Sequence, residues 1–287
     1  MNRLISLVHL YRYDLRCGFH GLLPRLGLAG CLAALCGIVT FLHASSNPSH
    51  ELHLSYSAYL ASIFGGTSEF VPERAEFFVL PAAWLCNCLA ISYITLDYPA
   101  KHLGGVGTMA ITLSGSRWSW WLSKCAWVVT CCLLCYGIDL IVCILCAIGT
   151  GASADLGFSK ELAQFMGFFM ATDSPLAQDT SGVEAFLLCA PTALAAISLV
   201  QLAFSVLCTP YMGFIVTVCS LFASAFLLNP MCMGNYLMIA RSNLAIPNGV
   251  DALRGAIIAC SIAAAAVLIG GAIFSRQSLI KRRTDTP

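Results

Sequence analysis

Cysteines are abundant in this 287-residue sequence and could carry metal-binding or redox chemistry. Sixteen are present, and Cys132/Cys135 and Cys143/Cys146 have the Cys-x-x-Cys spacing found in zinc and redox motifs. Zinc sites normally combine such a pair with a second pair or with histidines, and both pairs here lie in one apolar stretch. Cysteine in that setting behaves as a small apolar residue, so no metal site is predicted there.

The sequence His50-Glu-Leu-His53 is the second candidate metal site. The metalloprotease signature is His-Glu-x-x-His, which has one more residue between its histidines. We therefore interpret this stretch as a solvated loop and predict no metal.

Asp139, in Tyr136-Gly-Ile-Asp139, is the one carboxylate that we place inside an apolar span. An acid within a membrane is costly, so its side chain is expected to face a cavity, another helix or an ion path. It is the candidate residue of a translocation path. The alternatives are a hydrogen bond to a neighbouring span and a position near the outer headgroups.

Catalytic constellations are not found. Intramembrane aspartyl proteases need two acids in spans, and a membrane serine protease needs a histidine there, which this sequence does not provide. No Gly-x-x-x-x-Gly-Lys-Ser/Thr phosphate-binding loop occurs either. The chain is therefore not expected to be an enzyme or to hold a cofactor of its own.

The composition predicts a polytopic, all-α membrane protein. Hydrophobic residues make up 59% of the chain and charged residues 10%, whereas soluble domains carry about 25% charged residues. Six stretches approach or exceed the length of about 17–25 residues that a bilayer requires. They are Leu26–Leu42, Phe78–Leu96, Leu122–Ile148, Ala185–Leu207, Met212–Leu228 and Ala256–Phe274.

The distribution of lysines and arginines predicts the orientation. With both termini in the cytoplasm, eleven of the 15 basic residues fall inside, and four fall outside. The outer four are Arg74, Lys160, Arg241 and Arg254. By the positive-inside rule, we expect a multi-pass protein of the cell membrane with both ends cytoplasmic. The net charge of +1 gives no reason to expect a nucleic-acid partner.

Residues 1–20 are expected to form an amphipathic helix lying on the inner leaflet. Its apolar face carries Leu4, Leu7, Val8, Tyr11 and Leu15, and its polar face carries Arg3, His9, Arg12, Tyr13, Asp14 and Arg16. The alternative is a secretory signal over residues 1–44. The outer loops 43–77 and 151–184 are predicted to form either short capping helices or mobile loops.

Residues 97–121 are predicted to form a cytoplasmic elbow between the second and third spans. Apolar residues recur at helical spacing: Leu103, Val106, Met109, Ala110 and Leu113. Arg117 and Lys124 then bracket Trp118, Trp120 and Trp121. Indoles and basic side chains favour the headgroup layer, so Trp118, Trp120, Trp121 and Lys124 are predicted to anchor the elbow at the membrane.

This elbow resembles the inner loop of the type-2 family of ABC-transporter permeases. The resemblance is carried by Asp97-Tyr-Pro, by Gly104, Gly105 and Gly107, and by the run Leu113-Ser-Gly-Ser-Arg117-Trp-Ser-Trp-Trp-Leu-Ser-Lys124. The six spans and the helix at the N-terminus also fit that family. The sequence departs from it in the short connection between spans five and six, where many members have a re-entrant pair.

The resemblance implies a coupling helix seated in a separate ATPase subunit. The coupling residues would be Leu103, Gly104, Val106, Gly107, Met109, Ala110, Leu113 and Arg117. ATP and Mg would be bound by that ATPase, and a second permease subunit, identical or different, would complete the transporter. Alternating access would then export a peptide, an antibiotic or an amphiphile.

Two other classes remain open. One is an ion-coupled secondary transporter that uses Asp139, although such folds often show internal repeats and none is evident. The other is a non-transporting membrane sensor or assembly protein whose elbow docks a regulator.

Overall fold

The computed structural model describes residues 3–46, 54–69, 78–104, 111, 116–158, 160–165, 167, 181–243 and 245–277. Within these residues the regular elements are helices. They are α1 (Arg3–His20), α2 (Leu23–Ser46), α3 (Tyr56–Phe64), α4 (Ala82–Gly104), α6 (Arg117–Thr150), α7 (Lys160–Phe165), α8 (Ser181–Leu207), α9 (Pro210–Phe226) and α10 (Ala252–Arg276), with short 3-10 turns η3 (Met233–Leu237) and η4 (Ile239–Arg241). The prediction of an all-helical chain is confirmed.

The predicted spans fall on α2, α4, α6, α8, α9 and α10. Four of these helices, α2, α6, α8 and α10, are long and apolar enough to cross a membrane. The apolar part of α4, Ala82–Leu96, and the 17-residue α9 are shorter. The length and apolar character of the helices thus indicate a multi-pass membrane protein. The count of six spans stays a prediction.

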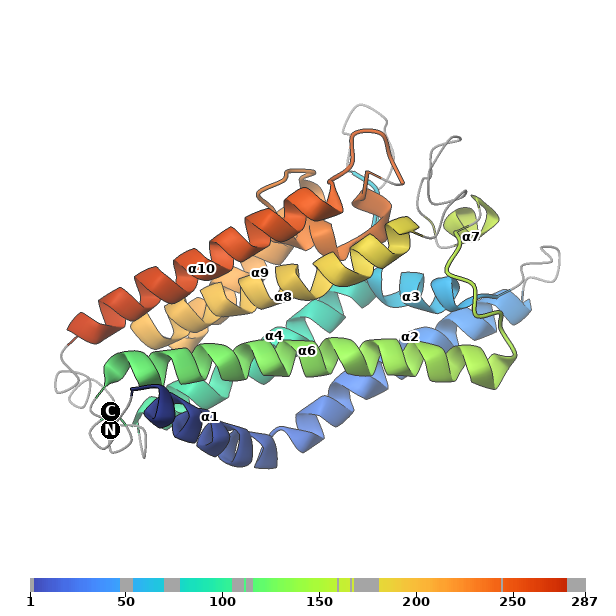
Figure 1. Cartoon of the computed structure of the whole chain (residues 1–287). Helices are drawn as coiled ribbons and strands as arrows, with labels where there is room; N and C mark the ends of the chain where they lie inside the picture. The colour runs from blue at the N-terminus through green and yellow to red at the C-terminus, as the bar shows by residue number, and fades with distance from the viewer. Residues whose placement is uncertain are drawn as a thin grey trace.

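The long helices lie side by side in an elongated bundle (Figure 1). Helix α8 is central, packing against α4, α6, α9 and α10. Two thirds of its apolar stretch (67%) is buried, against 22% for α2 and for α10, which line the outside. One end of the bundle gathers α1, the end of α4, the start of α6 and the end of α10.

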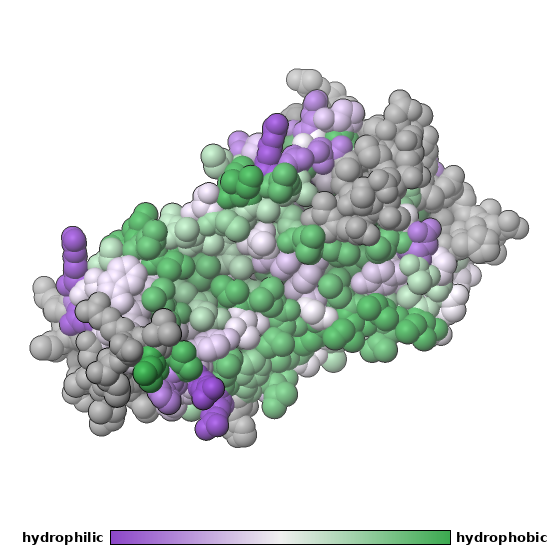
Figure 2. All heavy atoms as spheres, viewed as in Figure 1, coloured by the Kyte–Doolittle hydropathy of each residue, from purple (hydrophilic) through white to green (hydrophobic). Residues whose placement is uncertain are grey.

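On the face shown in Figure 2, the surface is apolar along the middle of the bundle, and hydrophilic side chains gather toward its ends. Large exposed hydrophobic residues on the outer helices include Leu35, Ile38, Ile141, Leu145, Ile257 and Ile269. A contiguous apolar surface of this kind is costly in water and suits lipid. This surface fits the multi-pass membrane protein that the helices indicate.

Capping residues fix several helix ends. The Ser116 side chain accepts a hydrogen bond from the Ser119 amide at the start of α6, and Asp251 does the same for Arg254 at the start of α10. Gly151 ends α6 in the left-handed conformation, with φ 69°, which glycine adopts without strain. Thr209 caps α9, which begins with Pro210, a residue suited to a first helical turn.

Short helices occur in both of the long loops that were predicted to lie outside the membrane. Helix α3 is almost wholly buried, and the Tyr56 amide donates to the Ser153 carbonyl at 2.9 Å. The hydroxyl of Ser57 also bonds to the Gly157 carbonyl at 2.7 Å. The start of the second loop therefore holds α3 against the bundle. Helix α7 is six residues long, and much of both loops lies outside the described residues.

Helix α1 forms as predicted, and one of its charged side chains is buried inside the protein. It packs against α6, with Asp14 2% exposed and Val8 43% exposed. Asp14, which the helical pattern assigns to the polar face, is thus buried against α6, whereas Val8 of the apolar face stays at the surface of the bundle. The reason is a charged partner on α6, which a helical-wheel pattern cannot reveal.

Candidate functional site

The predicted coupling residues are described only at the two flanks of the elbow. Leu103 and Gly104 end α4, and Arg117 begins α6. The remaining predicted coupling residues lie outside the described residues: Val106, Gly107, Met109, Ala110 and Leu113. Ile111, the one described residue between them, is buried.

Both flanks of the elbow bind the same carboxylate, that of Asp14 in α1. The Tyr98 hydroxyl, from α4, donates to Oδ1 at 2.9 Å, and Lys124 Nζ, from α6, lies 2.5 Å from the same oxygen. The Ser123 hydroxyl donates to the other oxygen, Oδ2. Asp14 and Lys124 are 2% and 0% exposed, so each charge is compensated inside the protein.

Aromatic rings complete the surroundings of Lys124. Its ammonium lies 4.5 Å from the Tyr98 ring centre and 5.2 Å from the Trp120 ring centre. Aromatic faces attract cations, and more so when water is excluded. The start of α6 is therefore joined to α1 and α4 by one cluster of Asp14, Tyr98, Trp120, Ser123 and Lys124, which we call the Asp14 cluster.

A second set of contacts joins the start of α6 to the end of α10. Arg117 donates to the carbonyls of Ser275, at 3.0 Å, and Gln277, at 2.5 Å. These carbonyls lie at a helix C-terminus, where they lack intrahelical partners and where a positive charge is favourable. Trp121 Nε1 also donates to the Val267 carbonyl at 2.8 Å.

Four residues were predicted to anchor the elbow at the headgroups, and among them Trp118 alone is exposed, at 37%. Trp120, Trp121 and Lys124 are buried among helices, so these three side chains do not lie among lipid headgroups. The cause is that α6 starts at Arg117 and runs for 34 residues, about 51 Å. The cluster therefore forms its first turns, which face α1, α4 and α10.

Asp139 lies in α6 and is fully buried. Its Oδ2 accepts a hydrogen bond from Asn87 Nδ2 of α4 at 2.8 Å, which is the interhelical bond considered as an alternative. Its Oδ1 and the Oδ1 of Asn87 have no hydrogen-bond partner. An ion path through this pair remains a prediction.

Arg241, predicted from the sequence to lie in an outer loop, is a buried charge. Its guanidinium donates to Ala225 O at 2.5 Å, Leu227 O at 3.1 Å and Asn235 Oδ1 at 2.7 Å, and also to the Ser224 carbonyl. It thus caps the C-terminal end of α9. Burial lowers the pKa of Arg241 to about 10, so the side chain is still charged at neutral pH. The sequence signal that could have indicated this buried position is a single arginine after an apolar stretch.

Among the residues that the structure describes, no group of three or more His, Cys, Asp and Glu side chains could hold a metal ion. His50 and His53 lie outside them. In the part of the chain that the structure describes, the geometry of the site is that of a contact region between helices α1, α4, α6 and α10.

No protein-family model, no curated protein and no solved structure matches this chain.

Proposed function

We propose that this chain is the transmembrane permease subunit of an ABC transporter, in which residues 97–121 receive the movement of a separate ATPase. The observation that supports this proposal best is the convergence of both elbow flanks on Asp14. Tyr98 lies at the start of the elbow and Lys124 follows its end, and both bind that one carboxylate.

Such a joint suits the transmission of force. Separating Lys124 from Asp14 would leave a charge buried without compensation, which is strongly unfavourable. Helices α1, α4 and α6 are therefore expected to move together. Helix α10 is expected to move with them, because Arg117 of α6 is hydrogen-bonded to its C-terminal end. Movement of an ATPase seated under the elbow would thus reach four helices at once.

The remaining parts of the proposal follow from the family that the elbow resembles. ATP and Mg are bound by the ATPase, and a second permease subunit, identical or different, completes the transporter. The exported compound is a peptide, an antibiotic or an amphiphile. The bundle lies in the cell membrane with both termini in the cytoplasm.

The test is the double substitution Val106→Asp with Met109→Asp, followed by recovery of the cognate ATPase and measurement of stimulated ATP hydrolysis. Each apolar side chain buried on a partner contributes roughly 1.5–3 kcal/mol, so docking should weaken by a factor of a hundred or more. His9→Asp with Arg16→Asp, at exposed positions of α1, is the control. Full recovery of the ATPase by the elbow variant would show that this segment is not a coupling helix.

The Asp139–Asn87 pair favours a second candidate, an ion-coupled secondary transporter. A carboxylate with one unpartnered oxygen inside an apolar bundle is the type of residue that exchanges protons or cations in such proteins. Transport that requires a proton or sodium gradient, and no ATPase, would favour this candidate over the permease.

A further inference from the structure

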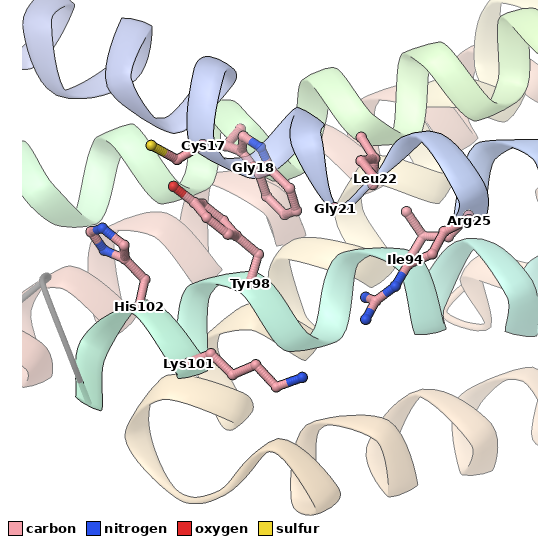
Figure 3. Close-up of a pocket in the computed structure, with 10 residues that line it drawn as sticks. Cys17, Gly18, Gly21, Leu22, Arg25, Ile94, Tyr98, Lys101 and His102 are labelled. Carbon is pink, nitrogen blue, oxygen red and sulfur yellow. The ribbon is translucent and has the colours of Figure 1, made fainter.

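A groove of about 400 Å³ lies where α1 passes into α2, facing the last turns of α4 (Figure 3). Residues from α1 and α2 line one side, and residues from α4 line the other, with Trp127 of α6 also lining it. It lies at the end of the bundle that the positive-inside rule places at the cytoplasmic leaflet.

The groove combines an apolar wall with cationic side chains. Leu22, Ile94 and Trp127 are buried and supply the apolar part. Arg25 and Lys101 supply the charges, from α2 and α4, and in Figure 3 their side chains extend toward one another. The Arg25 guanidinium also lies 5.1 Å from the centre of the Tyr93 ring, which limits its freedom.

Polar atoms without partners occur on the same walls. Both ring nitrogens of His102, and Nε1 of Trp127, are buried and have no hydrogen-bond partner. Buried polar groups are nearly always satisfied, so such atoms beside a groove indicate a ligand with hydrogen-bonding oxygens. In Figure 3 the side chains of Tyr98 and His102 both extend from α4 toward α1.

We propose that this groove binds an anionic phospholipid of the inner leaflet. The phosphate lies between Arg25 and Lys101, and an acyl chain follows Leu22, Ile94 and Trp127. Basic pockets between helices on the cytoplasmic side suit anionic headgroups, and an apolar wall suits the acyl chain. The site does not depend on the transport role proposed above, only on the orientation.

The experiment uses the full chain, purified in a mild detergent and delipidated. Its thermal unfolding is followed during titration with phosphatidylglycerol, with phosphatidylcholine of the same acyl chains, or with inorganic phosphate. Phosphatidylglycerol should stabilise the protein at concentrations at least tenfold lower than phosphatidylcholine. Inorganic phosphate should have little effect, because it has no chain to bury. An equal response to the two lipids, or full stabilisation by phosphate alone, would overturn the assignment.

The matched variants separate the groove from the general surface charge. Arg25→Gln with Lys101→Gln should raise the apparent Kd for phosphatidylglycerol roughly 30-fold. Arg12→Gln with Arg16→Gln removes the same charge from exposed positions of α1 and should leave that Kd unchanged. An equal loss in both pairs would refute the proposal. If the first pair does not fold, the exposed Lys101→Gln alone should raise the Kd about fivefold, and an unchanged Kd would also refute it.

Discussion

Asp14 of α1 and Lys124 of α6 form a buried ion pair, with Oδ1 and Nζ 2.5 Å apart, across 110 residues of sequence. The pair joins the first helix of the chain to the longest one, at the point where the predicted elbow ends. The pair therefore stabilises the bundle, and in the proposed function it also transmits movement between the two helices.

The first prediction concerns this ion pair. Asp14→Ala should lower the free energy of unfolding by about 3–5 kcal/mol, because Lys124 would stay buried without its partner. Asp14→Leu with Lys124→Met should recover most of that loss, since it removes both charges. Unfolding in detergent, with the exposed Arg16→Gln as control, measures this. A stable Asp14→Ala variant would show that the pair contributes little.

The second prediction concerns the contact between α6 and α10. A Cβ at Gly270 would lie 2.5 Å from Cζ2 of Trp121, and one at Gly271 would lie 2.3 Å from Cζ3 of Trp118. Gly270→Ala should therefore destabilise the protein by about 1–3 kcal/mol through overpacking. Gly137→Ala is the control, because its added Cβ would have no atom within 4 Å apart from its chain neighbours and the nearby backbone of its own helix. Equal melting temperatures for the two variants would contradict the close packing of Trp121.

The third prediction concerns Arg241. Arg241→Gln should cost about 3 kcal/mol, because the carbonyls at the end of α9 lose charged donors. Arg241→Lys should also destabilise, since an ammonium cannot reproduce the fork of the guanidinium. Thermal unfolding is the measurement, and Arg254→Gln at an exposed position of α10 is the reference. A lysine variant as stable as the native protein would show that charge alone suffices.

The fourth prediction concerns Asp139. Asp139→Asn keeps an acceptor for Asn87 and should fold normally, whereas Asp139→Leu should cost about 1–3 kcal/mol by leaving the amide unpaired. Asn87→Leu added to Asp139→Leu should recover stability. If the pair lies on an ion path, Asp139→Asn will also change the pH dependence of transport. Unchanged transport in the Asn and Leu variants would leave the residue with a structural role only.

The fifth prediction concerns orientation and uses variants that retain one cysteine each. Cys17 near the end of α1 and Cys208 between α8 and α9 are exposed, and Cys232 follows α9 and is half-buried. An impermeant thiol reagent should label Cys17 and Cys208 only from the cytoplasm, and Cys232 only from outside. Labelling of Cys232 from the cytoplasmic side would reverse the topology derived from the basic residues.

The sequence by itself determined the class of protein and the positions of the long helices. Apolar stretches such as Ala185–Leu207 and Ala256–Phe274 became α8 and α10 because composition and length act locally. The amphipathic pattern of residues 1–20 likewise became α1, and Asp139 lies inside a long helix as predicted. These features depend on residues that are close together in the chain, so they can be predicted from the sequence alone.

Only the tertiary structure decided which side chains meet. Lys124, Trp120 and Trp121 suit a headgroup layer as well as a buried cluster, because each joins an apolar body to a polar tip. Which setting they occupy depends on Asp14 and on Gly270, both far away in sequence. The buried position of Arg241 depends in the same way on a distant partner, the carbonyls at the end of α9. Long-range partners of this kind follow from how the helices pack, and one helical pattern is compatible with many packings.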